Sequence, residues 1–327
     1  MMLRLVIALL LCLVATSVEA ATCFWVSGTG TWDNSTDAAH WKSTSGGGTA
    51  CAATGGVPKN AGDVATFDGS SGGGTVTNNV DLNIGEIIAG AFTGTLDWAT
   101  NNKNVTVSAA TGISFTGAGT RTINLGNGTW TLTGLGSTTW NMATVTGLTF
   151  NANSSTIVFA PSGVGSQTFD FGAKAVNVVT LSARTGASNV KDSTASHTIA
   201  TLNIAAPNIF QVSNGATLTI TNAFNWVGTS SQPIYLVTSN VAGGVSTIAS
   251  GVAGTCTWCA IRTITFTGAG SFTANNSFNL QNNTNISFNG PAAFGGSGGC
   301  ILGGWLLWRD MPEHLNDNFP AWLEKVI

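Results

Sequence analysis

Short segments in which apolar and polar residues alternate dominate the chain between residues 75 and 289. Apolar residues alternate with Thr, Ser or Asn, as in Val105-Thr106-Val107, Trp130-Thr131-Leu132 and Leu218-Thr219-Ile220. This period of two predicts short strands with one apolar and one polar face. Clusters of Gly, Asn and Ser end the segments, and these residues favour tight turns. The pattern therefore predicts an all-β chain of many short strands.

The spacing of these strands favours a solenoid over other β architectures. Strongly apolar segments recur about every 17 to 25 residues, which is close to the perimeter of one coil. Propeller blades repeat at about 40 to 50 residues and immunoglobulin-type sandwiches at about 100, and neither repeat is found. The sequence Phe-Thr-Gly-Ala-Gly at Phe115–Gly119 recurs at Phe266–Gly270. We predict a right-handed parallel β-helix of about ten coils, whose strands pair with the coils above and below.

Composition supports this fold and narrows the function. The chain has 327 residues, of which 43% are hydrophobic and only 8% charged, with 42 glycines. Ordinary soluble domains carry about 25% charged residues, so a helical enzyme with a charged surface is excluded. A solenoid needs only polar, β-compatible residues outside, which Thr and Asn supply. The formal net charge of −3 leaves no basic surface for nucleic acid, so we expect no nucleic-acid partner.

The first residues have the pattern of a secretory signal peptide. Arg4 precedes the apolar run Leu5–Ala15, and small residues surround a cleavage site after Ala20. The run is too short to span a bilayer, so we expect a secreted or cell-surface protein with no transmembrane span in the mature chain. The chain is accordingly divided into a signal peptide (1–20), an N-terminal capping region (21–74), a β-solenoid repeat domain (75–290) and a Gly-rich linker with an apolar, partly helical tail (291–327).

The N-terminal region contains features suited to closing one end of a solenoid. Open terminal coils expose unpaired backbone, and the closely spaced Trp25, Trp32 and Trp41 can cover the end of an apolar column. Cys23 and Cys51 bracket most of this stretch, and an oxidising compartment favours disulfides. Closing a loop of about 28 residues contributes around 3 kcal/mol in the loop-entropy model. We predict a Cys23–Cys51 disulfide and an N-terminal cap.

Two motifs carry a resemblance to a known family. Residues 25–33 read Trp-Val-Ser-Gly-Thr-Gly-Thr-Trp-Asp, and residues 57–69 contain Val-Pro, Gly-Asp and Phe-Asp-Gly. This opening resembles the β-solenoid proteins of phage tails, prophages and bacterial surfaces, and Cys256–Ile261 is similar to their Cys-x-x-Cys coil near the C-terminal end. Residues 272–283 lack the Trp-Tyr and Asp-Gly-Gly-Asn-Asn run common in that family's last coil. The resemblance implies an extended structural or surface-recognition role without a reaction.

The cysteines and histidines do not predict a cofactor site. A redox Cys256-x-x-Cys259 motif would require a helix in a βαβ unit, whereas the residues that follow read as a strand. We interpret this pair as a structural disulfide or as paired free thiols. The three histidines, His40, His197 and His314, show no zinc-ligand spacing to the cysteines, so we expect no metal and no other cofactor. The partner of Cys300 is left open.

An enzyme of the β-helix class remains an alternative. Polysaccharide lyases and glycoside hydrolases need carboxylates, alone or with a basic residue, on one lateral face. Asp170, Lys174, Arg184 and Asp192 form the densest charge group of the repeat region. We interpret them as solvated loop charges and predict no catalytic residue.

The C-terminal tail differs from the coils. Residues 300–308 are apolar but too few to span a bilayer, and Asn318 before Pro320 predicts a short helix. The tail can fold back onto the rod, or dock on a membrane interface or on another envelope or virion protein. The candidate docking residues are Trp305, Trp308, Phe319 and Trp322.

Together, these patterns predict a secreted, non-catalytic, adhesin-like structural protein of the cell surface. Stacked Thr and Asn ladders present weak hydrogen-bonding groups at regular spacing, which suits an extracellular glycan as the partner. The signal peptide favours a bacterial envelope protein over a virion part, because virions normally assemble in the cytoplasm. The alternatives are a polysaccharide lyase or glycoside hydrolase of β-helix fold, and a phage or prophage tail-associated structural protein.

Overall fold

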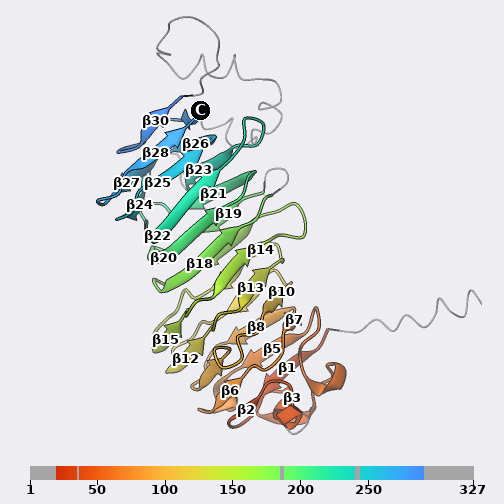
Figure 1. Cartoon of the computed structure of the whole chain (residues 1–327). Helices are drawn as coiled ribbons and strands as arrows, with labels where there is room; N and C mark the ends of the chain where they lie inside the picture. Colours follow the sequence, from red (N-terminus) through yellow and green to blue (C-terminus); the bar gives the residue numbers. More distant parts are fainter. Residues whose placement is uncertain (1–19, 35–36, 185–187, 240–243, 291–327) are drawn as a thin grey trace, which may run out of the picture.

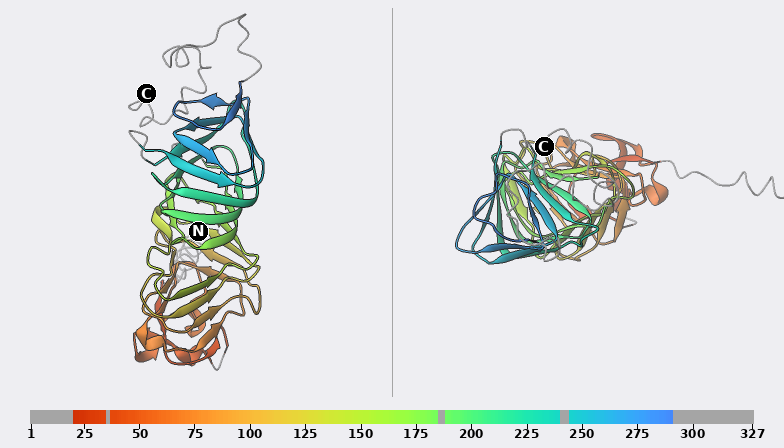
Figure 2. Two further views of the ribbon diagram at one scale, coloured as in Figure 1. Left: turned by 90° about the vertical axis from the view of Figure 1, so that its left-hand side faces the viewer. Right: turned by 90° about the horizontal axis from the view of Figure 1, so that it is seen from above.

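The chain winds into an elongated stack of β coils. The computed structural model describes residues 20–34, 37–184, 188–239 and 244–290. Successive coils follow the sequence from the N-terminal end to the C-terminal end, and the C-terminal coils are displaced sideways when viewed along the stack (Figures 1 and 2). Helical structure in these residues consists of short 3-10 turns: η2 (Asp37–His40), η3 (Thr54–Gly56) and η4 (Gly69–Ser71).

The first sheet has 13 strands and runs along the whole stack. Its strands, in spatial order from the N-terminal end, are β4 (Gly47–Ala50), β3 (Trp41–Thr44), β1 (Thr22–Trp25), β5 (Val64–Phe67), β8 (Glu86–Ala89), β11 (Ile113–Ser114), β14 (Gly136–Asn141), β17 (Gln167–Asp170), β19 (Val190–Asp192), β21 (Asn208–Val212), β23 (Ile234–Thr238), β26 (Cys259–Arg262) and β29 (Phe278–Asn279).

The second sheet has 12 strands and divides near its C-terminal end, where β22 pairs with both β24 and β25. Its strands are β7 (Leu82–Ile84), β10 (Val105–Val107), β13 (Thr129–Leu132), β16 (Thr156–Phe159), β18 (Ala175–Leu181), β20 (Ser196–Ile204), β22 (Thr217–Val227), β25 (Gly254–Thr257), β28 (Phe272–Asn275) and β30 (Ser287–Asn289), with β24 (Ser246–Ser250) and β27 (Ile264–Thr267) on the other branch.

The third sheet has five strands and covers only the N-terminal coils. It comprises β2 (Gly30–Thr31), β6 (Thr75–Thr77), β9 (Thr95–Asp97), β12 (Arg121–Asn124) and β15 (Leu148–Asn151). Coils from β5 to β16 therefore have three strands. The next three coils, β17–β18, β19–β20 and β21–β22, have two, and the coils β23–β25 and β26–β28 again have three.

Strand pairing confirms the predicted parallel stack. Apart from β3 and β4, each described strand pairs in parallel with strands one coil away, and among the described residues only the pairs β1–β3 and β3–β4 are antiparallel. Such pairing of sequential coils is the arrangement of a parallel β-helix. The right-handed winding stays a prediction, supported by the strong preference of parallel β crossovers for that hand.

Coil length varies more widely than the sequence pattern suggested. The pairing register advances by 18 residues from Ile261 to Asn279 and by 29 residues from Trp140 to Phe169. A solenoid tolerates this variation because strands alone must stay in register, while turns absorb additional residues on the surface. The predicted period of about 17 to 25 residues therefore holds for many coils, but not for the longer ones or for the last step from Thr273 to Ser287, which advances by 14.

The apolar positions of the alternating pattern form one continuous core. In the first sheet, Ile87, Ile113, Trp140 and Phe169 stand in register on successive coils, and all four are fully buried. Aromatic rings connect neighbouring coils, as where Trp130 meets Trp140 with ring centroids 5.8 Å apart. The stack therefore encloses a packed apolar column, as the alternation predicts.

The repeated Phe-Thr-Gly-Ala-Gly sequence marks one kind of turn. Gly117 and Gly268 both have positive φ, of 120° and 103°. A Cβ atom at either position would overlap a backbone oxygen of the preceding coil, Gly90 O or Ser250 O. In the first copy, buried Arg121 also donates hydrogen bonds to carbonyl oxygens of the turn. Glycine is required there because the coils approach too closely for a side chain.

Candidate functional site

Both predicted cysteine pairs lie within disulfide distance. The Cα atoms of Cys23 and Cys51 are 5.4 Å apart, and those of Cys256 and Cys259 are 6.0 Å apart. All four side chains are buried. Cys256 lies in β25 and Cys259 begins β26, so this pair belongs to a turn between strands rather than to a helix start. Of the two interpretations of the Cys-x-x-Cys motif, the structure supports the disulfide. Cys300 lies outside the described residues.

The three N-terminal tryptophans form a buried cluster at the first coils. Trp25 and Trp41 have ring centroids 5.1 Å apart, and Trp32 and Trp41 have centroids 5.0 Å apart. The indole nitrogen of Trp41 donates to the backbone oxygen of Trp32 at 3.0 Å. Trp25 ends β1 and Trp41 begins β3. Both strands lie at the N-terminal end of the stack (Figure 1). The capping role of the cluster stays a prediction.

Two groups of predicted residues fall outside the described parts of the chain. They are the signal peptide up to residue 19 and the tail candidates Trp305, Trp308, Phe319 and Trp322. Secretion and tail docking therefore stay predictions.

The predicted charge group does not gather on a lateral face. Asp192 and Arg184 are buried, so the expectation that these charges face water is wrong for both. The Arg184 guanidinium donates to the side chain of Gln167, and the Lys174 ammonium donates to Leu148 O at 2.9 Å. Because strand alternation turns Asp192 towards the core, this group lacks the paired surface carboxylates that glycoside cleavage requires.

Asp192 is instead part of a buried pair that the sequence interpretation missed. The Oδ2 atom of Asp192 lies 3.6 Å from Nδ1 of His197, and its Oδ1 accepts a hydrogen bond from Thr194 N at 2.9 Å. Burial raises the pKa of Asp192 to about 8 and lowers the pKa of His197 to about 4. Near neutral pH both side chains are therefore mainly uncharged, which suits their position in the core.

Two columns of residues, polar at every position except Val158, stand on the outer surface in register across successive coils. The long polar ladder lies on the second sheet, and its last two members are joined by a hydrogen bond of 3.3 Å from Asn203 to Thr180. It comprises Asn83, Thr106, Thr131, Val158, Thr180 and Asn203. The short threonine ladder lies on the third sheet and comprises Thr75, Thr95, Thr122 and Thr149. All members of both ladders are half-buried or exposed.

Other exposed asparagines stabilise turns through hydrogen bonds to the next coil. The side chain of Asn104 accepts a hydrogen bond from Thr129 N at 2.9 Å, one coil away. Asn102 accepts one from Asn127 N at 2.7 Å in the same way. These side chains supply acceptors for backbone N–H groups that the turns leave unpaired.

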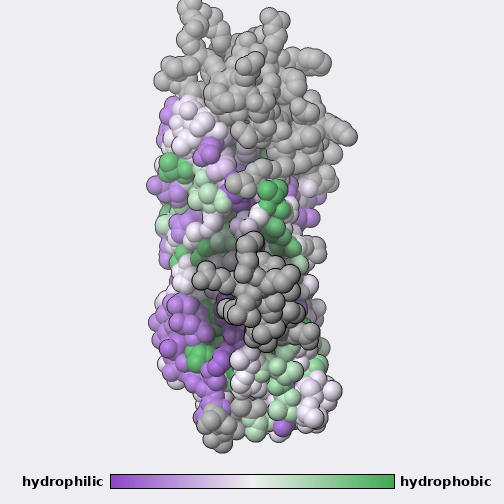
Figure 3. Space-filling view, turned by 90° about the vertical axis from the view of Figure 1, so that its right-hand side faces the viewer, coloured by the Kyte–Doolittle hydropathy of each residue, from purple (hydrophilic) through white to green (hydrophobic). Residues whose placement is uncertain are grey.

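Hydrophilic residues gather on one side of the N-terminal coils, at the left of the view in Figure 3.

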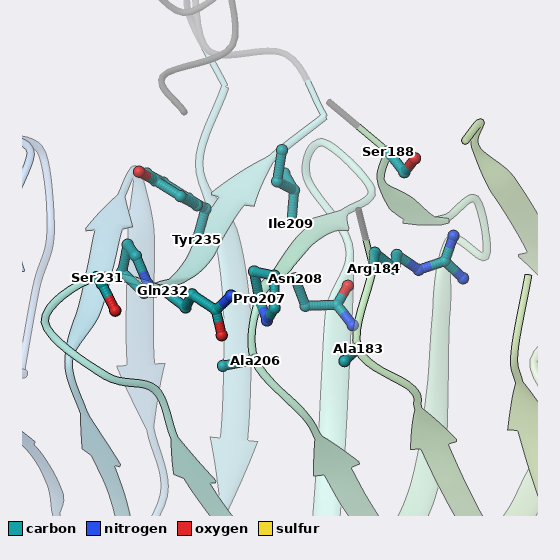
Figure 4. Close-up of a pocket in the computed structure, with 11 residues that line it drawn as sticks. Ala183, Arg184, Ser188, Ala206, Pro207, Asn208, Ile209, Ser231, Gln232 and Tyr235 are labelled. Carbon is teal, nitrogen blue, oxygen red and sulfur yellow. The ribbon is translucent and has the colours of Figure 1, made fainter. Parts of the chain in front are cut away.

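A cavity of about 460 Å³ opens between the turns that lead into β19, β21 and β23 (Figure 4). Its walls include Pro207, Ile209, Pro233 and Tyr235, with Gln232 among the polar residues. Burial raises the pKa of Tyr235 to about 12, so its phenol stays neutral. The lining of this cavity is mixed, because Arg184, Ser188, Asn208 and Ser231 also contribute to its walls.

Neither the metal-binding chemistry of the described residues nor a comparison with known proteins points to a function. Within the described residues, no three His, Cys, Asp or Glu side chains form a group that could hold a metal ion. The helical segments that the structure describes include none with the length and apolar character to cross a membrane. Comparison with known proteins found no matching family model, curated protein or solved structure. Function is therefore inferred from the fold and its surfaces.

Proposed function

We propose that this protein is a secreted, non-catalytic structural rod of the cell surface that binds extended glycans through the long polar ladder. The observation that carries the proposal is the ladder itself, five of whose six members are Thr or Asn on consecutive coils. Paired strands place these groups about 4.8 Å apart. Regular spacing lets a repeating polymer engage many weak hydrogen-bonding groups at once.

The side chains of the ladder suit this role. Threonine is β-branched, so its side chain is restricted before binding and loses little further freedom when a ligand contacts it. The core beneath the ladder is apolar and continuous, which holds the polar groups in a fixed geometry.

The rest of the proposal is that the N-terminal tryptophan cluster caps a right-handed stack, and that residues 1–20 direct export.

The first test removes hydroxyl groups from the long polar ladder. The triple substitution Thr106→Val, Thr131→Val and Thr180→Val keeps a β-branched side chain at each position while deleting three hydrogen-bonding groups. We expect the mature protein to bind at least one class of polysaccharide on a glycan array. Because a hydrogen bond contributes about 0.5–1.5 kcal/mol, the triple variant should bind at least about tenfold more weakly.

A matched control makes the same change on another face. The substitutions Thr95→Val, Thr122→Val and Thr149→Val remove three hydroxyl groups from the short threonine ladder, and we expect them to leave glycan affinity unchanged. Circular dichroism and thermal unfolding would verify that both variants fold. Equal losses in the two variants, or no glycan binding by the parent protein, would contradict the proposal. Release of new reducing ends from a bound polysaccharide would favour the enzyme alternative.

A further inference from the structure

The cavity beside β21 and β23 has the size of a small-ligand site. Its volume is about 460 Å³, and sites for small molecules usually measure about 300–1,000 Å³. Its walls come from three successive connections, between β18 and β19, between β20 and β21, and between β22 and β23. The cavity therefore crosses two coil steps, a length of about 10 Å along the stack.

One wall of the cavity contains a buried acceptor without a partner. Asn208 is only 2% exposed, and its side-chain nitrogen donates to Ser182 O at 2.9 Å. Its Oδ1 atom accepts no hydrogen bond within the described residues. Figure 4 shows this amide extending towards Ala183 and Arg184, which also line the cavity. Buried amide oxygens are rarely left unpaired, so this atom points to a ligand that donates a hydrogen bond.

The neighbouring connection contributes a buried donor. The backbone nitrogen of Arg184 donates to Pro207 O at 2.8 Å, so Arg184 and Asn208 start from adjacent positions. The terminal nitrogens of the Arg184 guanidinium donate to the Gln167 side chain and to Asn189 O. Its Nε–H group, which is also buried, has no acceptor within the described residues. The cavity wall therefore contains one unpaired acceptor and one unpaired donor.

These two groups favour a ligand with hydroxyl groups. A hydroxyl group both donates and accepts, whereas an anion only accepts and an ammonium group only donates. The described residues that line the cavity include no Asp or Glu to attract a cation. Three rings, those of Pro207, Pro233 and Tyr235, supply apolar surface in the same wall. A sugar ring combines several hydroxyl groups with C–H faces that pack against such surfaces.

We infer that this cavity binds one neutral sugar unit, whose hydroxyl groups pair with Asn208 Oδ1 and Arg184 Nε and whose C–H face packs on the ring surfaces. The exposed Gln232 forms part of the rim, and Figure 4 shows the amides of Asn208 and Gln232 on either side of Pro207. The long polar ladder contributes no residue to the cavity wall. The inference therefore goes beyond the proposed function and does not depend on it.

Titration of the full mature chain, isotopically labelled at its arginine side chains, tests this site by NMR. The Nε–H signal of Arg184 reports on the cavity directly, and Arg184→Lys identifies that signal. The probes are the methyl glycosides of glucose, galactose, mannose and N-acetylglucosamine, with methyl glucuronide as the charged comparison. We expect at least one neutral glycoside to shift the signal saturably, with a Kd in the millimolar range.

Two variants of the cavity wall and one control locate the bound sugar. Asn208→Leu deletes the unpaired acceptor and should weaken binding about fivefold or more, and Gln232→Ala, which changes only the exposed rim, should weaken it about twofold to threefold. Gln211→Ala is the matched control, because Gln211 lies in β21 but outside the cavity wall, and it should leave the Kd unchanged. The triple threonine variant of the long polar ladder should also keep the parent Kd.

The possible outcomes separate this site from the ladder. No saturable shift with any neutral glycoside would overturn the inference. A shift with methyl glucuronide alone would also overturn it, because the cavity would then recognise an anion. Binding that survives both Asn208→Leu and Gln232→Ala would place the sugar elsewhere on the rod. None of these results changes the outcome of the glycan array, which measures the binding of polymers to the ladder.

Discussion

The buried Asp192 and His197 make stability depend on pH in a specific way. Above pH 6.5 the unfolded chain has lost both protons, whereas the folded chain keeps the Asp192 proton until about pH 8. Stability should therefore fall as pH rises from 6.5 to about 8, with a slope approaching about 1.4 kcal/mol per pH unit. Between about pH 4 and 6.5, both states bind one proton on this pair, because the unfolded chain protonates histidine instead of aspartate. Stability should be nearly constant there.

The substitution Asp192→Asn isolates the contribution of the carboxyl group. Without it, only the lowered pKa of His197 remains, so stability should rise from about pH 4 to 6.5 and then stay constant. Thermal unfolding across this pH range measures both profiles. Asp81→Asn, at an exposed position several coils away, is the control and should keep the parent profile. An alkaline decrease that survives Asp192→Asn would show that another group causes it.

The burial of Asp192 was in part predictable from the sequence. Val190, Lys191 and Asp192 alternate, so Asp192 shares the inward side of Val190 in β19. The sequence analysis instead interpreted Asp192 as a solvated charge, because charged residues usually face water. Its partner could not be predicted in the same way, because His197 lies in β20 and meets Asp192 only through the packing of two sheets.

At the scale of elements, the sequence pattern predicted the positions of strands well, but it predicted the lengths and pairing of the coils less well. Alternation identified β10, β13 and part of β22, since a half-buried strand imposes its own pattern. Alternation carries no information on where a strand pairs. The length of β22 and its pairing with two strands therefore depend on contacts across coils, which local sequence does not encode.

The turn at Gly117 should tolerate no side chain. Gly117→Ala would combine a φ of 120° with an overlap between the new Cβ and Gly90 O. We expect a loss of at least about 2 kcal/mol in the free energy of unfolding, measured by denaturant titration. Gly251→Ala is the matched control, because Gly251 lies beside open space and lacks a positive φ, and its effect should be small. Equal effects of the two substitutions would show that close coil approach does not determine the turn.

At the scale of the whole molecule, the sequence predicted the stack but not its change of cross-section. The scarcity of charge and the short period led to parallel coils, and pairing confirms them. The third sheet ends at β15, after which three coils have two strands and the division of the second sheet then gives two coils with three. These changes depend on how turns pack against their neighbours. The sequence predicted the glycan-binding face only in general terms, as a surface of stacked Thr and Asn residues. The members of the long polar ladder could be named only once the register was known.

Because each coil contacts mainly its neighbours, the two disulfides should stabilise opposite ends of the rod independently. Removing the first with Cys23→Ala and Cys51→Ala opens a loop with a sequence separation of 28 and should cost around 3 kcal/mol. Hydrogen exchange should show the lost protection in β1, β5 and β8, while β23 and β26 keep theirs. The control, Cys256→Ala with Cys259→Ala, opens a separation of only 3, so its loss should be smaller and limited to the C-terminal coils. A uniform loss along all coils would mean that the rod unfolds as one cooperative unit rather than from its ends.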